Sequence, residues 1–155
     1  MGRPAQVTDL GILLVVAYQE FIRELHAAHA AAGFTDLGRS DGFVFRSLAD
    51  NPMTVSELAA HLEITKQGAG QIIDDMERRG YVERGPDPAD RRAKLVRLSE
   101  RGQLALANAR RFHREYERRL SRTHGPDAVR TLRTMLEAIA GSDQSVDRRM
   151  RPFYL

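Results

Sequence analysis

Apolar residues recur at helical spacing along the first part of the chain. Steps of three and four residues, the period of one face of an α-helix, connect Val15, Tyr18, Ile22, Leu25 and His29. This pattern predicts one long helix over residues 9–32. Thr8 is suited to cap its first turn, and Gly33 is suited to end it. A helix with so wide an apolar stripe is expected to bury it against other helices.

The last part of the chain shows the same period twice. One helix is predicted over residues 100–121, with Ser99 as its cap, and another over residues 127–140, after a break at Gly125-Pro126. The first stripe consists of Leu104, Asn108, Phe112, Tyr116 and Leu120, and the second of Val129, Leu132, Leu136 and Ile139.

The middle of the chain predicts shorter elements. Helices are expected over residues 40–50, 55–62 and 66–79, and strands over residues 81–85 and 93–98. In the first of these helices, Phe43, Val44 and Leu48 are expected to point inward. A T-x-x-E capping box at Thr54–Glu57 begins the second of these helices, and Thr65 caps the third. The strands pair as a hairpin with its tip at 87–92. The predicted fold is therefore mainly α with a small β-hairpin wing.

Two short helices on either side of a tight turn are typical of a helix-turn-helix motif. We expect residues 40–99 to form a winged helix-turn-helix lobe. The flanking residues 1–39 and 100–155 are expected to form a helical dimerisation region, because their two apolar arms exceed what one small lobe can cover. A two-fold interface would cover them. The residues assigned to it are Val15, Leu132, Leu136, Ile139 and Phe153.

The composition excludes several classes of function. The 155 residues include no cysteine, which excludes disulfides, thiolate chemistry and cysteine-bearing zinc sites. The net charge of +3 and the isoelectric point of about 9.7 are compatible with a nucleic-acid partner. The longest apolar run, Ile12–Ala17, is too short to span a membrane. The first residues lack the apolar region of a signal peptide, so a cytoplasmic protein is expected.

The second helix of a helix-turn-helix motif enters the major groove with its first residues. Here the candidates are Thr65, Lys66, Gln67, Gly68 and Gln71. Lysine can donate to guanine, and glutamine can bond adenine through two hydrogen bonds. Glycine inside a helix costs about 1 kcal/mol relative to alanine. The glycines at 68 and 70 fit either a close approach to DNA or close packing on a neighbouring helix.

The hairpin tip carries Arg91 and Arg92 on a proline-stiffened loop, and Lys94 follows on the returning strand. Adjacent arginines suit the minor groove and its flanking phosphates. Asp90 is repelled by phosphate, so we expect it to brace the loop. An ordinary solvated turn is the alternative. Acidic residues in this region are expected to support arginines or to point away from DNA; they are Asp74, Asp75, Glu77 and Glu83.

Five strings in the same order resemble the MarR family of winged-helix regulators. They are Met53–Ala59, Ile64–Gly68, Glu77–Arg84, Asp87–Arg92, which fits the pattern D-x-x-D-R-R, and Leu98–Gly102. The resemblance implies a homodimer joined by the terminal helices and bound to a pseudo-palindromic operator. It also implies Lys66, Gln67 and Gln71 in the major groove, Arg91 in the minor groove, and a pocket whose small-molecule ligand releases DNA.

The ligand hypothesis rests on aromatic side chains beside a cation, which suit a small aromatic or phenolic carboxylate. The candidates are Tyr18, Phe21, Phe43, Arg46 and Phe112. The alternative, which helical spacing favours, is that all five are core or dimer contacts.

An enzyme is not predicted. The chain has five histidines but no nucleophile–base string and no phosphate-binding glycine loop. We expect no metal and no cofactor. The predicted function is a transcriptional regulator, a repressor, that binds double-stranded DNA sequence-specifically as a homodimer. A ligand-free DNA-binding protein and a winged helix that contacts proteins are the alternatives.

Overall fold

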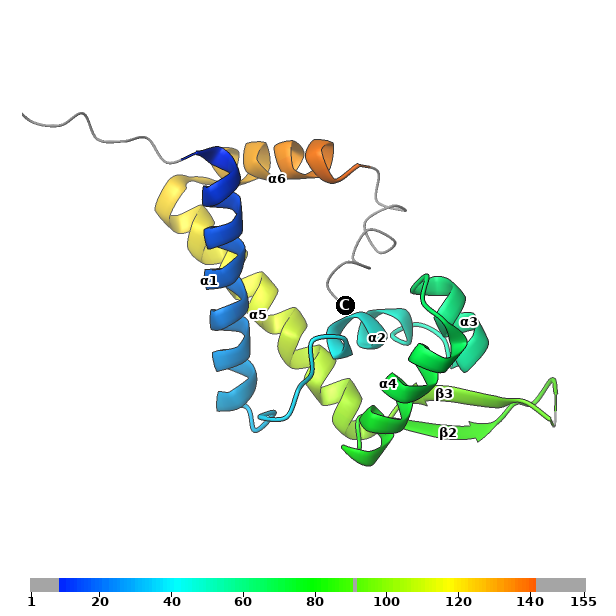
Figure 1. Cartoon of the computed structure of the whole chain (residues 1–155). Helices are drawn as coiled ribbons and strands as arrows, with labels where there is room; N and C mark the ends of the chain where they lie inside the picture. Colours follow the sequence, from blue (N-terminus) through cyan, green and yellow to red (C-terminus); the bar gives the residue numbers. More distant parts are fainter. Residues whose placement is uncertain (1–8, 91, 142–155) are drawn as a thin grey trace, which may run out of the picture. The chain divides into compact units, whose positions relative to one another are not determined.

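The computed structural model describes residues 9–90 and 92–141. The chain divides into two compact units, Met1–Thr35 and Asp36–Leu155 (Figure 1). This division follows packing within a single chain and separates the first helix from the rest. The predicted domains instead group the first and last helices by a shared role at a subunit interface, and their boundaries stay a prediction.

The first unit is built on helix α1, Leu10–Ala31. Its end confirms the role predicted for Gly33, which has a φ of +88°. The Gly33 amide donates to Ala30 O at 3.0 Å and the Phe34 amide donates to His29 O at 2.9 Å, the two hydrogen bonds of a Schellman motif. The rings of His29 and Phe34 meet edge to face at 6.2 Å. At the other end Asp9 occupies the cap position without a side-chain hydrogen bond, and the predicted cap Thr8 lies outside the described residues.

The second unit contains five helices and three strands within the described residues. They are α2 (Asp41–Ser47), β1 (Met53–Thr54), α3 (Val55–His61), α4 (Lys66–Arg78), β2 (Val82–Pro86), β3 (Lys94–Leu98), α5 (Glu100–His124) and α6 (Pro126–Ala140). The predicted fold class, mainly helical with a small β wing, is confirmed.

The sheet has the strand order β1-β3-β2, and both pairs are antiparallel. Val82 pairs with Leu98 and Pro86 with Lys94, which gives the predicted hairpin. Strand β1 was not predicted. It has only two residues, too few to show an alternating pattern, and it exists because Met53 pairs with Val96.

Several element ends differ from the prediction. Helix α2 ends at Ser47 rather than at residue 50, and Ser40 occupies its cap position without a side-chain hydrogen bond. Helix α5 continues three residues beyond 121, to His124, and ends where Gly125 takes a φ of +88°. In α2 and α5 alike the difference lies at the C-terminal end, and helix ends are the part of a helix that sequence propensity predicts least well.

The core of the second unit lies between α2, α3, α4, the sheet and the first turns of α5. Its largest fully buried side chains are Tyr81, Phe45, Leu58, Ile73, Met76, Val44 and Val96. Two inward positions were predicted wrongly. Phe45 is buried while Phe43 is only half-buried. Leu104 is 58% exposed, because α5 instead turns Ala105 and Leu106 toward the lobe.

A cluster of polar side chains holds the chain where it enters the second unit. The Arg79 guanidinium donates to both carboxylate oxygens of Asp41, at 2.6 and 3.1 Å, and to Asp36 O at 2.7 Å. The Tyr81 hydroxyl donates to the Asp36 carboxylate, and Arg101 donates to the same carboxylate at 3.0 Å. The Arg101 guanidinium also lies 4.5 Å from the centre of the Tyr81 ring.

The cluster links the C-terminal end of α4 to the start of α2 and the first turn of α5. Burial, followed by the hydrogen bond to Asp36, raises the pKa of Tyr81 to about 12. The same hydrogen bond lowers the pKa of Asp36 below its usual value. The phenol therefore stays protonated and the carboxylate charged at neutral pH.

Removing the buried partner of Arg79 should cost much more stability than removing its exposed partner. The Asp41 side chain is 3% exposed and that of Asp75 is 41% exposed, and both pair with Arg79. We expect Asp41→Ala to lower the free energy of unfolding by about 3 kcal/mol, because Arg79 keeps a buried charge without its main partner. Asp75→Ala should cost about 1 kcal/mol or less. Urea unfolding of both variants measures this; equal losses would contradict it.

Candidate nucleic-acid interface

Both helices of the helix-turn-helix, α3 and α4, are capped at their N-termini by side chains of the same segment. The Glu57 amide donates to Thr54 Oγ1 at 3.2 Å, and the Thr54 amide donates to Glu57 Oε2 at 2.7 Å, which confirms the predicted capping box. Between the helices, Glu63 takes a φ of +54° and the Ile64 amide donates to Ala59 O at 3.0 Å. This turn sets the direction in which α4 begins.

Thr65 begins α4 in extended conformation and its Oγ1 accepts a hydrogen bond from the Gly68 amide at 3.0 Å. Behind this cap, Ala69, Ile73 and Met76 are fully buried. The opposite side presents Lys66, Gln67 and Gln71, all exposed. Within the described residues these three side chains have no hydrogen-bond or ion-pair partner, so their donors and acceptors are available to a partner molecule.

The glycines of α4 do not pack on a neighbouring helix. A Cβ at Gly70 would meet no atom within 4 Å in the described part of the chain. A Cβ at Gly68 would lie 3.1 Å from Thr65 Oγ1, an atom of the cap itself. Of the two explanations from the sequence, close packing is thus disfavoured. Close approach of an external surface to the α4 backbone remains as the reason for these residues.

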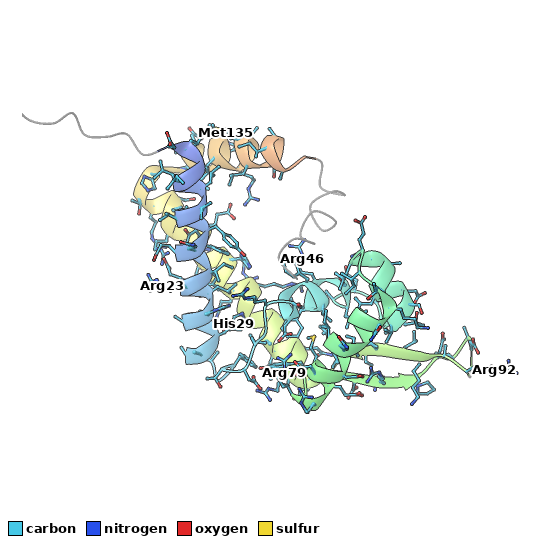
Figure 2. All side chains as sticks on the ribbon, viewed as in Figure 1. Arg23, His29, Arg46, Arg79, Arg92 and Met135 are labelled. Atoms are coloured by element: carbon cyan, nitrogen blue, oxygen red, sulfur yellow. The ribbon has the colours of Figure 1, made fainter. Side chains whose placement is uncertain are left out.

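The wing is the hairpin of β2 and β3, which extends beyond the helices of the lobe (Figure 1), with Arg92 at its far end (Figure 2). Asp90 Oδ1 accepts from the Arg92 amide at 2.9 Å, and Asp90 O accepts from the Ala93 amide at 3.0 Å. Asp90 is therefore in contact with the loop backbone. Arg92 and Lys94 are exposed, whereas Arg91 lies outside the described residues.

Other arginines near α4 are engaged with carboxylates of the same lobe. The Arg84 guanidinium lies 2.6 Å from Asp74 and also pairs with Glu77, which joins β2 to α4. Arg97 pairs with Glu83 at 2.7 Å across the hairpin. Asp75 pairs with Arg78 and Arg79. These ion pairs confirm that the acidic residues of this region support arginines.

The predicted ligand-pocket residues fall in both units. Tyr18 and Phe21 lie on α1, Phe43 and Arg46 on α2, and Phe112 on α5. Burial, followed by the charge of Arg46, lowers the pKa of His113, the neighbour of Phe112. Two surface grooves of the second unit are lined by other residues. The ligand pocket stays a prediction.

The residues predicted for dimerisation are exposed in the single chain: Val15 by 54%, Leu132 by 46%, Leu136 by 42% and Ile139 by 63%. Phe153 lies outside the described residues. No helix within residues 9–90 and 92–141 has the length and apolar character needed to cross a bilayer. The same residues hold no group of three metal-ligating side chains.

Reasoning from the sequence missed the residues that hold α4 in place at its C-terminal end. Asp36, Asp41 and Arg101 meet Arg79 and Tyr81 only in the folded chain. Their sequence separations reach 65 residues, and no local pattern reports such contacts. The available signal was Asp41, a carboxylate in the first turn of a short helix.

A capped turn between α3 and α4, an exposed reading face and a β wing define a winged helix-turn-helix protein. Comparisons with known proteins identify the family: residues 35–93 match the family model described as MarR family. The transcriptional regulator HosA of Escherichia coli O111:H- is 35% identical over 94 residues, which are 57% of this chain and 68% of that protein. The chain belongs to the MarR family.

A second relative is the exopolysaccharide II synthesis transcriptional activator ExpG of Rhizobium meliloti, 25% identical over 131 residues. That match covers 84% of this chain but 66% of ExpG, just under two thirds. The solved structure of the transcriptional repressor CouR bound to a 23-mer DNA duplex is similar, with a TM-score of 0.64 and 26% identity over 91% of this chain and 99% of that chain. The names of these relatives describe transcriptional regulators.

Replacing Gly70 by alanine should stabilise the protein and weaken DNA binding. The site has room for the Cβ, and alanine favours a helix over glycine by about 1 kcal/mol. The same methyl group would stand between the helix backbone and a closely approaching duplex. We expect a higher unfolding midpoint in urea together with a raised Kd for DNA. Unchanged DNA affinity would show that close approach does not explain Gly70.

Proposed function

We propose that this protein binds a pseudo-palindromic operator as a homodimer, with α4 of each subunit in a major groove and each wing at a minor groove. The observation that carries the proposal is the exposed set Lys66, Gln67 and Gln71. These side chains have no partner in the described chain and lie on the first two turns of a helix whose other face is buried. The DNA-bound structure of CouR, a relative in fold, supports the same use of the fold.

The roles within α4 follow from chemistry. The two glutamines can each make a pair of hydrogen bonds to adenine, and lysine can donate to guanine O6 and N7. Thr65 and Gly68 form the cap, which keeps the first turn of α4 ordered. The start of a helix also favours a phosphate, because its first amides have no partner within the helix. We therefore assign base reading to Lys66, Gln67 and Gln71, and backbone positioning to the cap.

The wing contributes cations to the phosphates and the minor groove. Arg92 and Lys94 are exposed, and the Asp90 hydrogen bonds hold the backbone beside Arg92. Arg91, assigned to the minor groove from the family resemblance, completes the proposed set. Contacts of this kind position a protein on DNA and make its affinity depend on salt.

Dimerisation is proposed through the terminal helices. The apolar face of α6 is open in the single chain, with Leu132, Leu136 and Ile139 all more than two fifths exposed. Helix α1 is open in the same way at Val15. A two-fold interface would cover these side chains and present two copies of α4, about one DNA turn or 34 Å apart.

Repression and release by a ligand are predictions from the sequence. ExpG is named an activator and CouR a repressor, so the relatives include both directions of regulation. The direction depends on where an operator lies relative to its promoter, and repression stays a prediction. Release by a small aromatic ligand also stays a prediction, since its candidate residues lie in two separate units.

Substitutions in α4 and in the wing should differ in their effects. We expect Gln71→Ala to relax the base preference at one operator position, with a cost of about 1–3 kcal/mol on the preferred sequence and an unchanged salt dependence. Arg92→Ala should weaken binding to all sequences and reduce the slope of log K against log salt by about 0.9. Selection of random duplexes followed by salt titration measures both. A Gln71→Ala variant with the wild-type preference would contradict the assignment of α4.

Introducing a charge into the apolar face of α6 should separate the subunits. Leu136→Asp would bury a carboxylate in the proposed interface, and we expect monomers in sedimentation analysis, with operator affinity reduced because each monomer holds a single half-site. Arg130→Asp is a control on the same helix, because Arg130 is 72% exposed and pairs with Asp127. A dimer that tolerates Leu136→Asp would exclude this face as the interface.

A further inference from the structure

The positive charge of this chain is concentrated outside its DNA-binding lobe. Residues 40–99 contain nine lysines and arginines against ten aspartates and glutamates, a net charge of −1. Helix α5 contains seven arginines against three glutamates, a net charge of +4, which exceeds the +3 of the whole chain. The main source of attraction for a polyanion is therefore α5.

Four of these arginines form a continuous row, here called the arginine ridge: Arg110, Arg114, Arg118 and Arg122. They follow one another at steps of four residues, so neighbours stand about 6 Å apart and the row extends for about 18 Å along the helix. All four are exposed. None of them has an ion-pair partner within the described residues.

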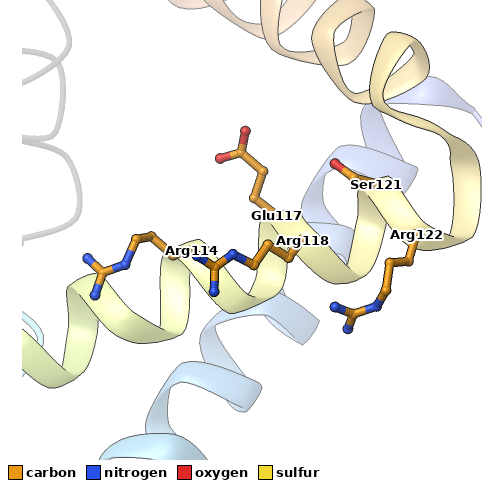
Figure 3. A pocket seen from close by; sticks show the side chains of 5 residues that line it. All are labelled: Arg114, Glu117, Arg118, Ser121 and Arg122. Carbon is orange, nitrogen blue, oxygen red and sulfur yellow. The ribbon is translucent and has the colours of Figure 1, made fainter.

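The ridge carries a cost within the isolated chain. Like charges four residues apart destabilise a helix by about 0.2–0.5 kcal/mol per pair. The nearby carboxylate of Glu117 does not neutralise it, because that side chain pairs with Arg133 of α6 at 2.7 Å. Figure 3 shows the Glu117 carboxylate and the Arg122 guanidinium leaving α5 in opposite directions. A row of unneutralised arginines is accounted for if an anionic partner binds it.

The ridge is continuous with the base of the wing. One surface groove is lined by Arg97 of β3 together with Arg110 and Arg114, and a second groove is lined by Arg114, Arg118 and Arg122 with Glu117 and Ser121 (Figure 3). Arg114 lines both. Arginine side chains thus follow one another from β3, where Arg97 pairs with Glu83, along α5, and Asp50 also lines the first groove.

Within the described residues no carboxylate forms an ion pair with the ridge, and the carboxylates that line its grooves are Glu117 and Asp50. Residues 142–155, which lie outside the described part, contain three arginines and two aspartates and would add positive charge. A second α5 would bring another net +4. The guanidinium group of arginine binds phosphate through two parallel hydrogen bonds. CouR, a protein of similar structure, binds DNA, whose backbone is a chain of phosphates.

We propose that the arginine ridge of α5 is a second DNA-contacting surface, which binds the phosphate backbone of duplex DNA without reading its sequence. This inference rests on the proposed DNA-binding function. The ridge supplies the attraction that a lobe of net charge −1 lacks and brings the protein onto DNA before α4 reads bases. It adds to the recognition helix and the wing, whose residues are different.

The test removes two charges from the ridge and compares the result with the removal of two charges elsewhere. The variant is Arg114→Gln with Arg118→Gln, because glutamine preserves helix propensity. The matched control is Arg23→Gln with Arg130→Gln, two arginines whose side chains are 68% and 72% exposed. Affinity for a duplex of unrelated sequence is measured against salt concentration, with urea unfolding and sedimentation on every protein.

We expect the ridge variant to lower the slope of log K against log salt by about 1.8, or 0.9 for each lost phosphate contact. The control variant should keep the wild-type slope, and so should Arg114→Lys with Arg118→Lys, which retains both charges. An unchanged slope in the ridge variant would overturn the proposal, as would an equal fall in the control. A weaker dimer with an unchanged slope would place the ridge at the subunit interface and overturn it too.

The outcome also separates this inference from the proposed function. Wild-type protein that binds no duplex at low salt would defeat both. Wild-type binding with a normal salt slope, shared by the ridge variant, would defeat the ridge alone and leave the assignment of α4 standing.

Discussion

The burial of one face of α4 is the constraint on which the interface depends. Ala69, Ile73 and Met76 have no exposure, so the helix has a single orientation in which the lobe core is complete. At its far end, Arg79 holds the helix to Asp41 through two hydrogen bonds, at 2.6 and 3.1 Å. A helix held from behind and at its end must present its remaining face, with Lys66, Gln67 and Gln71, outward. These three side chains need no partners within the chain, because packing on the other side of the helix positions them.

The lobe and α5 differ in how their charges are arranged. Within the lobe, nearly every arginine close to α4 is paired with a carboxylate, as Arg84 is with Asp74 and Glu77. Those ion pairs connect the strands and helices of the lobe, but they leave it without an excess of positive charge. Helix α5 has the opposite character, with four exposed arginines in a row that form no ion pair within the described residues. If the proposed roles hold, this separation lets sequence specificity, which base contacts supply, and affinity, which phosphate contacts supply, be adjusted independently.

The terminal helices leave apolar side chains exposed in the single chain. No residue of α6 is buried, and its largest apolar side chains are exposed. Exposed apolar faces of this extent mark an interaction surface rather than a finished fold. The lobe, by contrast, buries its apolar residues fully and needs no partner for its own core. Stability of the lobe and assembly of the protein are therefore separate questions in this chain.

Local signals carried most of the fold. Thr54 and Glu57, Thr65 and Gly33 are capping residues whose hydrogen bonds lie within five positions along the chain, so the sequence alone predicted where these helices begin or end, and the helix-turn-helix followed from their spacing. The same reasoning reached the family and the three polar residues that the structure leaves exposed on α4. It could not find β1, which exists only through pairing with Val96, nor choose Phe45 over Phe43 as the buried ring. The polar cluster around Arg79 joins residues up to 65 positions apart. Likewise, only the structure shows that Glu117 pairs with Arg133 and not with an arginine of the ridge. Interactions between residues close together in the sequence can be predicted from the sequence itself. Strand pairing, burial and charge compensation between distant residues depend on how the whole chain packs.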